Sequence, residues 1–189
     1  MPVETPEGRD GPITGAGFLK GLRDEGVTHV VGLPDNDTAV LFELLPGDTR
    51  LRLVRVTREG EAFAVAAGLW LGGAAPFVVL QNTGLLESGD ALRGTASRMG
   101  VPLVMLVGYR GFAGLQARGR AAAAPVTRDE LVRTDVDTAA LMTEPTLAAW
   151  GVPFQRLDGS ADRVRLSEAF ALARAEERPV ALLLCHALS

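Results

Sequence analysis

The chain of 189 residues is poor in the side chains that most often carry hydrolytic or metal-dependent chemistry. It has one cysteine, Cys185, and two histidines, His29 and His186. A single cysteine excludes an internal disulfide and a cysteine-rich metal site. With only two histidines, a His-rich metal cluster is excluded and a Ser-His-Asp triad is not favoured. We therefore predict no metal ligand in this chain, and we interpret His29 as a packed residue inside a strand and His186 as incidental.

Basic charge and long apolar runs are also scarce. Lys20 is the only lysine, and the formal net charge is -4. Because no Lys/Arg cluster alternates with aromatic residues, we expect neither nucleic acid nor an anionic membrane surface as the main partner. The longest apolar stretch, residues 62–75, is too short and too rich in Gly and Ala to cross a bilayer of about 30 Å. The first dozen residues lack the apolar centre of a signal peptide. We expect a cytoplasmic protein.

The composition of the chain is that of a folded domain. With 47% hydrophobic and 22% charged residues, a chain of this length is expected to form one domain over residues 14–189, after a flexible lead-in over residues 1–13. Strand-like and helix-like segments alternate almost to the end. This alternation predicts an α/β fold, with a doubly wound, mainly parallel six-stranded sheet and helices on both faces. The expected strands are residues 29–31, 51–56, 77–80, 103–107, 153–157 and 180–185.

The following expectations about the helices can be checked against the structure. Thr14 is predicted to cap a helix that ends before Gly26. The segment 62–71 has no polar face, so we expect a helix buried on all sides. Further helices are expected at residues 87–98 and 138–150, the second interrupted near Pro145. Residues 111–125 have no steady period and are interpreted as a flexible loop or a loosely held helix.

In a parallel sheet of this kind, ligands bind at the carboxyl ends of the strands. Four polar or Gly-rich segments follow strands here: residues 32–37, 57–61, 81–84 and 108–111. Among them Glu59 lies at the entrance to the most apolar helix, where a carboxyl group in a poorly hydrated position can hydrogen-bond a ring nitrogen. From position alone the ordinary explanation is favoured: Glu59 and Glu61 are acidic residues that stabilise a helix N-terminus.

The remaining strand ends are equally open to two interpretations. Residues 81–84, Gln-Asn-Thr-Gly, can hold a planar polar ligand or can cap the next helix. Residues 32–36 can be a plain connection between strand and helix, and Arg110 can meet an anionic substrate or lie in solvent. The chain has neither the Gly-x-Gly-x-x-Gly of a dinucleotide turn nor the motif of a phosphate loop.

Taken together, these segments resemble the pyrimidine-binding domain of thiamine diphosphate enzymes. The resemblance is strongest to the alpha subunit of sulfopyruvate decarboxylase and the amino-terminal domain of phosphonopyruvate decarboxylase. The residues that carry it are Gly32-Leu33-Pro34-Asp35, Thr57 to Ala62, Ala66-Ala67-Gly68, Gln81 to Leu85, and Val101-Pro102 through Gly108-Tyr109-Arg110-Gly111. These motifs occur in family order and cover about residues 14–111.

The resemblance implies a role for each segment. Glu59 would contact the ring nitrogen of the aminopyrimidine and favour its imino form, as the catalytic and cofactor-activating residue. The cofactor would also be bound by Gln81, Asn82, Thr83 and Gly84. Pro34, Asp35, Asn36 and Arg110 would face the substrate. The implied reaction is decarboxylation of a small 2-oxo acid such as sulfopyruvate or phosphonopyruvate, in which the thiazolium ring accepts electrons.

One motif of the family is missing. Such enzymes hold the diphosphate and Mg²⁺ with Gly-Asp-Gly followed by Asn, whereas Gly47-Asp48 precedes Thr49 here and Gly89-Asp90 precedes Ala91. The resemblance therefore implies a separate beta subunit that carries Gly-Asp-Gly and holds Mg²⁺, in a hetero-oligomer. The sequence also departs from the family at Asn36 and Arg58, and after Gly111.

Two other functions remain open from the sequence. A non-catalytic binding or regulatory module would keep the fold without the chemistry. A flavodoxin-like nucleotide binder is disfavoured, because the first strand ends in Gly-Leu-Pro-Asp and not in a phosphate-binding loop.

Overall fold

The structure is a computed structural model. It describes residues 11–189, except for the side chains of Ala161 and Arg163. Most of the expected lead-in, residues 1–10, lies outside the described residues. Residues 11–13 contact the domain: Ile13 is buried, and its carbonyl accepts a hydrogen bond of 3.1 Å from the backbone N–H of Ser189.

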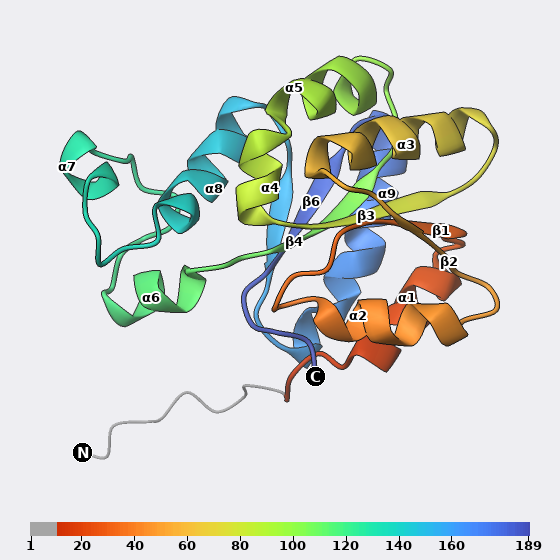
Figure 1. Ribbon diagram of the computed structural model, residues 1–189, viewed down its shortest axis with the longest axis horizontal. Coiled ribbons are helices and arrows are strands. Elements are labelled where there is room, and N and C mark those ends of the chain that lie inside the picture. The colour runs from red at the N-terminus through yellow and green to blue at the C-terminus, as the bar shows by residue number, and fades with distance from the viewer. Residues whose placement is uncertain (1–10) are drawn as a thin grey trace.

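The centre of the molecule is a six-stranded parallel sheet, as the sequence predicts (Figure 1). The strands run in the order β2-β1-β3-β4-β6-β5, and every neighbouring pair is parallel. Their bounds are β1 (His29–Gly32), β2 (Arg52–Arg55), β3 (Pro76–Gln81), β4 (Val104–Gly108), β5 (Phe154–Leu157) and β6 (Val180–Leu184). The expectation of a doubly wound α/β fold is confirmed.

Helices cover both faces of the sheet. One face carries α1 (Gly15–Asp24), α2 (Ala39–Leu44) and α9 (Val164–Glu176), and the other carries α3 (Glu59–Leu71), α4 (Asn82–Glu87), α5 (Gly89–Ala91) and α8 (Thr138–Ala149). Two more helices, α6 (Phe112–Ala117) and α7 (Arg128–Leu131), project from the body of the fold in Figure 1. Short helical turns of other types cover Leu45–Gly47, Leu92–Ser97 and Ser160–Arg163. No helix within residues 11–189 is long and apolar enough to cross a bilayer.

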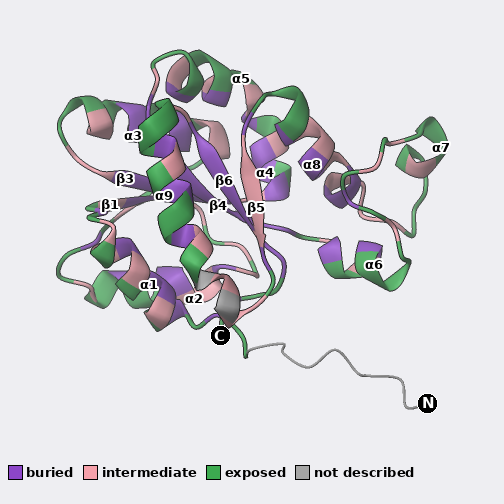
Figure 2. Ribbon diagram, turned by 180° about the vertical axis from the view of Figure 1, so that it is seen from behind, coloured by how far each residue is buried: buried purple, intermediate pink, exposed green. Residues whose placement is uncertain are grey.

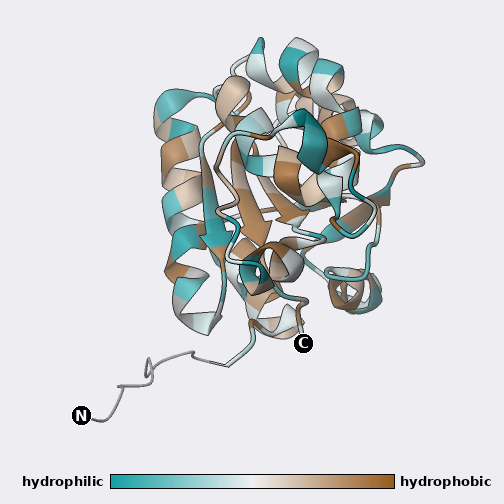
Figure 3. Ribbon diagram, turned by 90° about the vertical axis from the view of Figure 1, so that its left-hand side faces the viewer, coloured by the Kyte–Doolittle hydropathy of each residue, from teal (hydrophilic) through white to brown (hydrophobic). Residues whose placement is uncertain are grey.

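Alternate residues of the central strands serve two separate cores. Val31, Val78 and Met105 pack with α3 and α8, whereas Val30 and Phe77, which precede Val31 and Val78, pack with α1 and α9. This alternation follows from the period of two residues in a strand. Buried strands therefore read as continuous apolar runs, purple in Figure 2 and brown in Figure 3. The edge strand β2 differs, because Arg52 and Arg55 are exposed.

The first helix follows its sequence signals. Thr14 Oγ1 accepts a hydrogen bond of 3.2 Å from the backbone N–H of Gly17, so it caps α1 as predicted. Gly26 ends the segment with φ +80°, a left-handed conformation that favours glycine.

Two expectations about helices are wrong, and one helix was not expected. α3 is not buried on all sides, because Ala64, Gly68 and Leu71 are exposed and Leu71 keeps 67% of its surface accessible. The helical segment expected at residues 87–98 is present as α5 and a π-helical segment at Leu92–Ser97, but a separate helix that the sequence did not predict, α4, precedes it directly after β3. α8 is not interrupted, since Pro145 lies inside it. Proline removes one backbone donor, and the buried residues on both sides of it hold this helix together.

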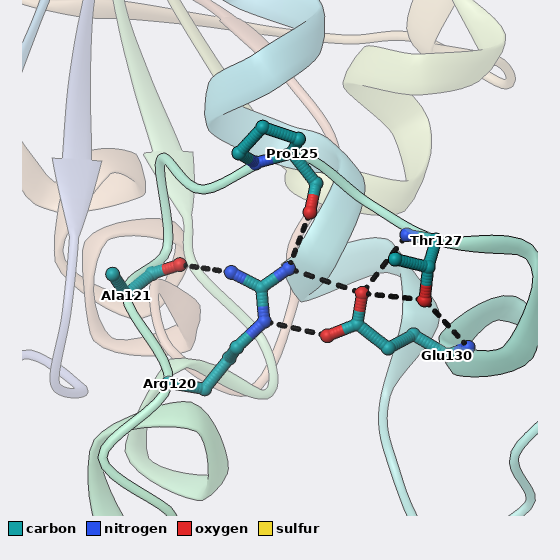
Figure 4. Close-up of polar contacts among 5 residues, drawn as sticks. All are labelled: Arg120, Ala121, Pro125, Thr127 and Glu130. Carbon is teal, nitrogen blue, oxygen red and sulfur yellow. Dashed lines mark hydrogen bonds and ion pairs between the residues drawn. The ribbon is translucent and has the colours of Figure 1, made fainter.

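Residues 111–125 contain the short helix α6 and a loop with side-chain contacts. Phe112 and Leu115 bury one side of α6. Beyond α6, the Arg120 guanidinium donates hydrogen bonds to the carbonyls of Ala121 and Pro125, at 2.6 and 2.9 Å, and to the Glu130 carboxylate at 2.6 Å (Figure 4). Glu130 also accepts a bond of 2.9 Å from the backbone N–H of Thr127. One ion pair therefore closes the loop between α6 and α7.

A buried carboxylate joins α8 to the sheet. Glu144 is 1% exposed and accepts two hydrogen bonds from the Arg156 guanidinium of β5, at 2.6 and 2.7 Å. The Tyr109 hydroxyl donates a third at 3.3 Å, and burial raises the pKa of that hydroxyl. Cys185 lies close by, and burial raises the pKa of its thiol to about 12. The network satisfies a charge that is otherwise costly to bury.

The loop contact predicts a local response to acid. The hydrogen bond from Arg120, with those from Thr127, lowers the pKa of Glu130 from its usual 4.5 to about 2. A carboxylate with a lowered pKa stabilises the fold above its unfolded value and loses that effect as pH falls through the folded value. We expect the NMR shift of the Thr127 amide to titrate with a midpoint near 2 in the native chain. A midpoint near 4.5 would contradict the contact, and Glu130→Gln should abolish the transition.

The buried pair predicts a stability difference between two arginine substitutions. Arg156→Met leaves the Glu144 charge buried without its ionic partner, so we expect the free energy of unfolding to fall by about 3 kcal/mol. Arg93→Met breaks an exposed pair with Asp90, and we expect a loss of less than about 1 kcal/mol. Urea unfolding of the two variants measures both values. Equal losses would show that Arg156 does not compensate Glu144.

Candidate active site

The carboxyl ends of β1, β3 and β4 lie side by side at one edge of the sheet. Gly32 of β1 pairs with Val79 of β3, and Gln81 of β3 pairs with Gly108 of β4. The chain moves outward from β1 to β2 and then returns to β3 on the other side of β1. The connections that leave β1 and β3 therefore diverge, and in open α/β sheets this is where ligands bind.

Two glutamates begin α3, and the structure separates their roles. Glu61 accepts hydrogen bonds from the backbone N–H groups of Thr57 and Arg58, at 2.9 and 3.3 Å, and a further bond from the Thr57 hydroxyl. The bonds from Thr57 hold the pKa of Glu61 below its usual value. Glu61 thus closes the N-terminus of the helix, in the way that an acidic residue at this position of a capping box does.

Glu59, the first residue of α3, is half-buried. Its side chain lies directly against Gly84 of α4. Within residues 11–189, no hydrogen bond or ion pair engages its carboxylate. Glu59 therefore presents two acceptor oxygens at the strand ends, while the neighbouring acid is already in use.

The segment 81–84 is the strand end and first turn of α4, and its side chains point to different places. The Asn82 amide is buried and donates hydrogen bonds to the Arg110 carbonyl at 3.0 Å and to Thr143 Oγ1 at 3.1 Å. Its Oδ1 is buried without a partner among the described residues. The Thr83 hydroxyl donates to Gln81 Oε1 at 2.8 Å. Asn82 therefore ties α4 to α8, and Gly84 contacts Glu59.

The loop after β1 brings a second carboxylate to the same edge. Asp35 Oδ1 accepts hydrogen bonds from the backbone N–H groups of Asp37 and Thr38, at 2.7 and 3.0 Å. A Cβ at Gly108 would lie 3.0 Å from both oxygens of Asp35, so the carboxylate reaches across to the end of β4. Burial and the charge of Asp35 raise the pKa of Asp37.

The other predicted pocket residues lie further out. Pro34 and Asn36 are exposed. Arg110 is also exposed, and its Nε lies 2.9 Å from Asp137 Oδ2. This ion pair occupies the guanidinium in the structure, and the sequence offered no signal for it because Asp137 is far along the chain.

The two histidines lie at opposite ends of the sheet: His29 begins β1, whereas His186 follows β6, where its charge opposes the raised pKa of Asp37. His29 is partly exposed at the start of β1, so its assignment as a packed core residue is wrong. Partial burial lowers the pKa of its ring, and the positive charge of Arg52 lowers it further. His186 lies 2.8 Å from Asp158 through its Nε2.

A surface groove adjoins Glu59 between the N-terminus of α3 and the helices α4 and α5. Its lining includes Arg58, Glu61, Ala64 and Glu87. The guanidinium of Arg58 forms an ion pair with Glu87 across it. Glu59 thus lies with Gly84 against it and without a hydrogen-bond partner among the described residues, while the groove is lined by the sequence neighbours of Glu59, Arg58 and Gly60, and not by the predicted site residues.

The class of protein that this fold and edge define is established by comparison with known families. Residues 14–130 match the model described as thiamine pyrophosphate enzyme, N-terminal TPP binding domain. The chain belongs to this family, and the expected resemblance is confirmed.

The curated relatives make the resemblance more specific. Phosphonopyruvate decarboxylase from Streptomyces viridochromogenes is 37% identical over 99 residues, which is 52% of this chain and 25% of the relative. The alpha subunit of sulfopyruvate decarboxylase from Methanothermobacter thermautotrophicus is 34% identical over 94 residues, 50% of this chain and 57% of that subunit. The match therefore spans from about a quarter to just over half of the length of these relatives.

Solved structures agree with the fold. The chain is similar to 4-hydroxybenzoylformate decarboxylase from Rhodococcus jostii, with a TM-score of 0.63 and 21% identity over 94% of this chain and 31% of that one. Benzoylformate decarboxylase from Polynucleobacter necessarius has a TM-score of 0.62 and 21% identity, over 91% and 30% of the two chains. At this identity the likeness shows the fold.

Proposed function

We propose that this chain is the pyrimidine-binding subunit of a thiamine diphosphate-dependent 2-oxo acid decarboxylase, and that a separate beta subunit holds the diphosphate and Mg²⁺. The observation that carries the proposal is the Glu59 carboxylate. It stands at the strand ends without a partner among the described residues, in a chain whose family binds this cofactor.

The residues present fit the pyrimidine half of the cofactor. A ring nitrogen needs one hydrogen-bonding carboxyl group, and Glu59 offers it because Glu61 is occupied by the helix terminus. Glu59 would hold a proton at that nitrogen, and the half-buried position limits competition from water. When bound, thiamine diphosphate supplies the ring that accepts electrons as carbon dioxide leaves. Gln81 and Thr83, at the start of α4, are proposed to line the same site with Asn82 and Gly84.

The substrate side of the site is proposed at the loops after β1 and β4. Asp35, Asn36 and Pro34 face it from one loop and Arg110 from the other. A small 2-oxo acid is an anion, so Arg110 would exchange its contact with Asp137 for the substrate. The relatives named for phosphonopyruvate and sulfopyruvate support an anionic substrate of this class.

The exposed side of α3 supports the proposal that a partner chain binds this protein. Ala64, Gly68 and Leu71 lie on it, and the helix has no charged residue between Glu61 and its end. Apolar surface of this kind favours burial against another protein. Because Glu59 begins the same helix, a subunit covering this face would also lie beside the site. Two further observations support the same hetero-oligomer: this chain lacks Gly-Asp-Gly, and its relatives include alpha subunits of sulfopyruvate decarboxylase. We propose that the hetero-oligomer is cytoplasmic.

The first test of the function replaces one carboxylate oxygen of Glu59 by an amide nitrogen. Glu59→Gln keeps the shape of the side chain but cannot hold and release the proton, so we expect turnover to fall at least about 100-fold. The measurement is carbon dioxide release from sulfopyruvate or phosphonopyruvate by the chain co-expressed with a Gly-Asp-Gly-bearing partner. The matched variant Glu61→Gln should keep most of the turnover. Near-normal turnover of Glu59→Gln would refute the assigned role.

The second test separates the two halves of the site. We expect the isolated chain to bind thiamine diphosphate weakly and without dependence on Mg²⁺, because the diphosphate group and its metal ion are proposed to sit on the partner. Calorimetric titration with and without Mg²⁺, before and after addition of the partner chain, measures this. Tight, Mg²⁺-dependent binding by the isolated chain would exclude a split site.

A further inference from the structure

Gly84 lacks a side chain at the point where Glu59 lies. A Cβ added to Gly84 would lie 2.2 Å from Cγ of Glu59, 2.4 Å from Cδ and 2.5 Å from Oε1. Carbon atoms in ordinary contact are about 3.5–4.0 Å apart. The position therefore has no room for a methyl group while Glu59 keeps its present conformation.

The outer bonds of the glutamate cannot relieve this contact. Cγ is attached directly to Cβ, so only rotation about the Cα–Cβ bond moves it. That rotation also carries the carboxylate to another place. A side chain at position 84 would thus displace both oxygens of Glu59 from the strand ends.

Neither helix is free to move away instead. α4 is attached to its neighbours by Asn82, whose amide donates hydrogen bonds to the Arg110 carbonyl and to Thr143 Oγ1. The start of α3 is fixed by Glu61 and by the ion pair of Arg58 with Glu87 at the other end of α4. The contact between Gly84 and Glu59 lies between these attachments.

Some other glycines nearby have room for a side chain. A Cβ at Gly68 of α3, or at Gly94 in the π-helical segment, would meet no atom within 4 Å among the described residues. At Gly60 the nearest atom would be 3.6 Å away, an ordinary contact. Gly89 and Gly108 are crowded too, but a Cβ there would meet Trp150 at 2.6 Å and Asp35 at 3.0 Å, respectively. What distinguishes position 84 is that the side chain opposite it is Glu59.

We infer that Gly84 is a positioning residue: the absence of its side chain sets the rotamer of Glu59 and holds the carboxylate at the strand ends. This role rests on the proposed function, in which Glu59 activates the cofactor. It differs from lining the pocket, because Gly84 acts through Glu59.

The contact itself is tested on the isolated chain without cofactor. Gly84→Ala should raise the equilibrium constant of unfolding about 10-fold with Glu59 present, as overpacking does. In the Glu59→Ala background the same change should have an effect of less than about 2-fold, because the opposing atoms are gone. Gly94→Ala is the control and should behave alike in both backgrounds. Equal effects of Gly84→Ala in the two backgrounds would overturn the inference.

The positioning role is tested on the complex with the partner chain. A misplaced carboxylate should lower kcat about 100-fold, while the concentrations of cofactor and substrate at half-saturation change little. Gly94→Ala should retain the parent kcat. An unchanged kcat for Gly84→Ala, or a loss explained entirely by weaker cofactor binding, would overturn the role even if the stability coupling is present.

The two proposals fail in different ways. If Glu59→Gln retains normal turnover, the proposed function is wrong and the role of Gly84 in it falls, whatever the unfolding cycle reports. If Glu59→Gln is inactive and Gly84→Ala has the parent kcat, the function stands and the positioning role is wrong.

Discussion

Burial of β3 and β4 on both faces is the constraint on which the rest of the structure depends. All of Val104–Gly108 and most of Pro76–Gln81 are buried, so these strands have no polar face on which to place a functional group. Polar side chains are therefore confined to the strand ends, where the backbone leaves the sheet. Asp35, Asn82 and Arg110 all lie in connections of this kind, and α3 delivers Glu59 to the same region from the edge strand β2.

The fold was predictable because its signals are local. Apolar runs located the central strands β3, β4 and β6. The other three strands also begin within one residue of the expected positions, and Thr14 and Gly26 located the ends of α1. The failures concern what a helix meets in space. The composition of α3 gives no sign that Leu71 is left in solvent in the single chain, since an apolar helix can face its own core or another subunit. Nor can the sequence show that Asn82 begins a helix, because the partners of its amide, Arg110 and Thr143, lie 28 and 61 residues away.

The candidate site was predicted in part for the same reason. The choice of Glu59 over Glu61 came from a resemblance, and the structure adds a physical reason for it: hydrogen bonds to Thr57 and Arg58 occupy Glu61. The contact of Gly84 with Glu59 could not be predicted from the sequence, because the two residues are on different helices and a single glycine gives no periodic signal that shows what it packs against. The ion pairs of Arg110 with Asp137 and of Arg120 with Glu130 likewise depend on how the chain returns after α6.

The single thiol has a use that has nothing to do with catalysis. Cys185 is buried at the end of β6, beside the network of Glu144 and Arg156. A thiol that is both buried and protonated at neutral pH reacts only when the structure around it opens. Because the chain contains no second cysteine, the rate at which Cys185 is alkylated measures how often this side of the sheet opens. The native chain therefore carries its own probe for local unfolding, which reports on β6 without a label or a substitution.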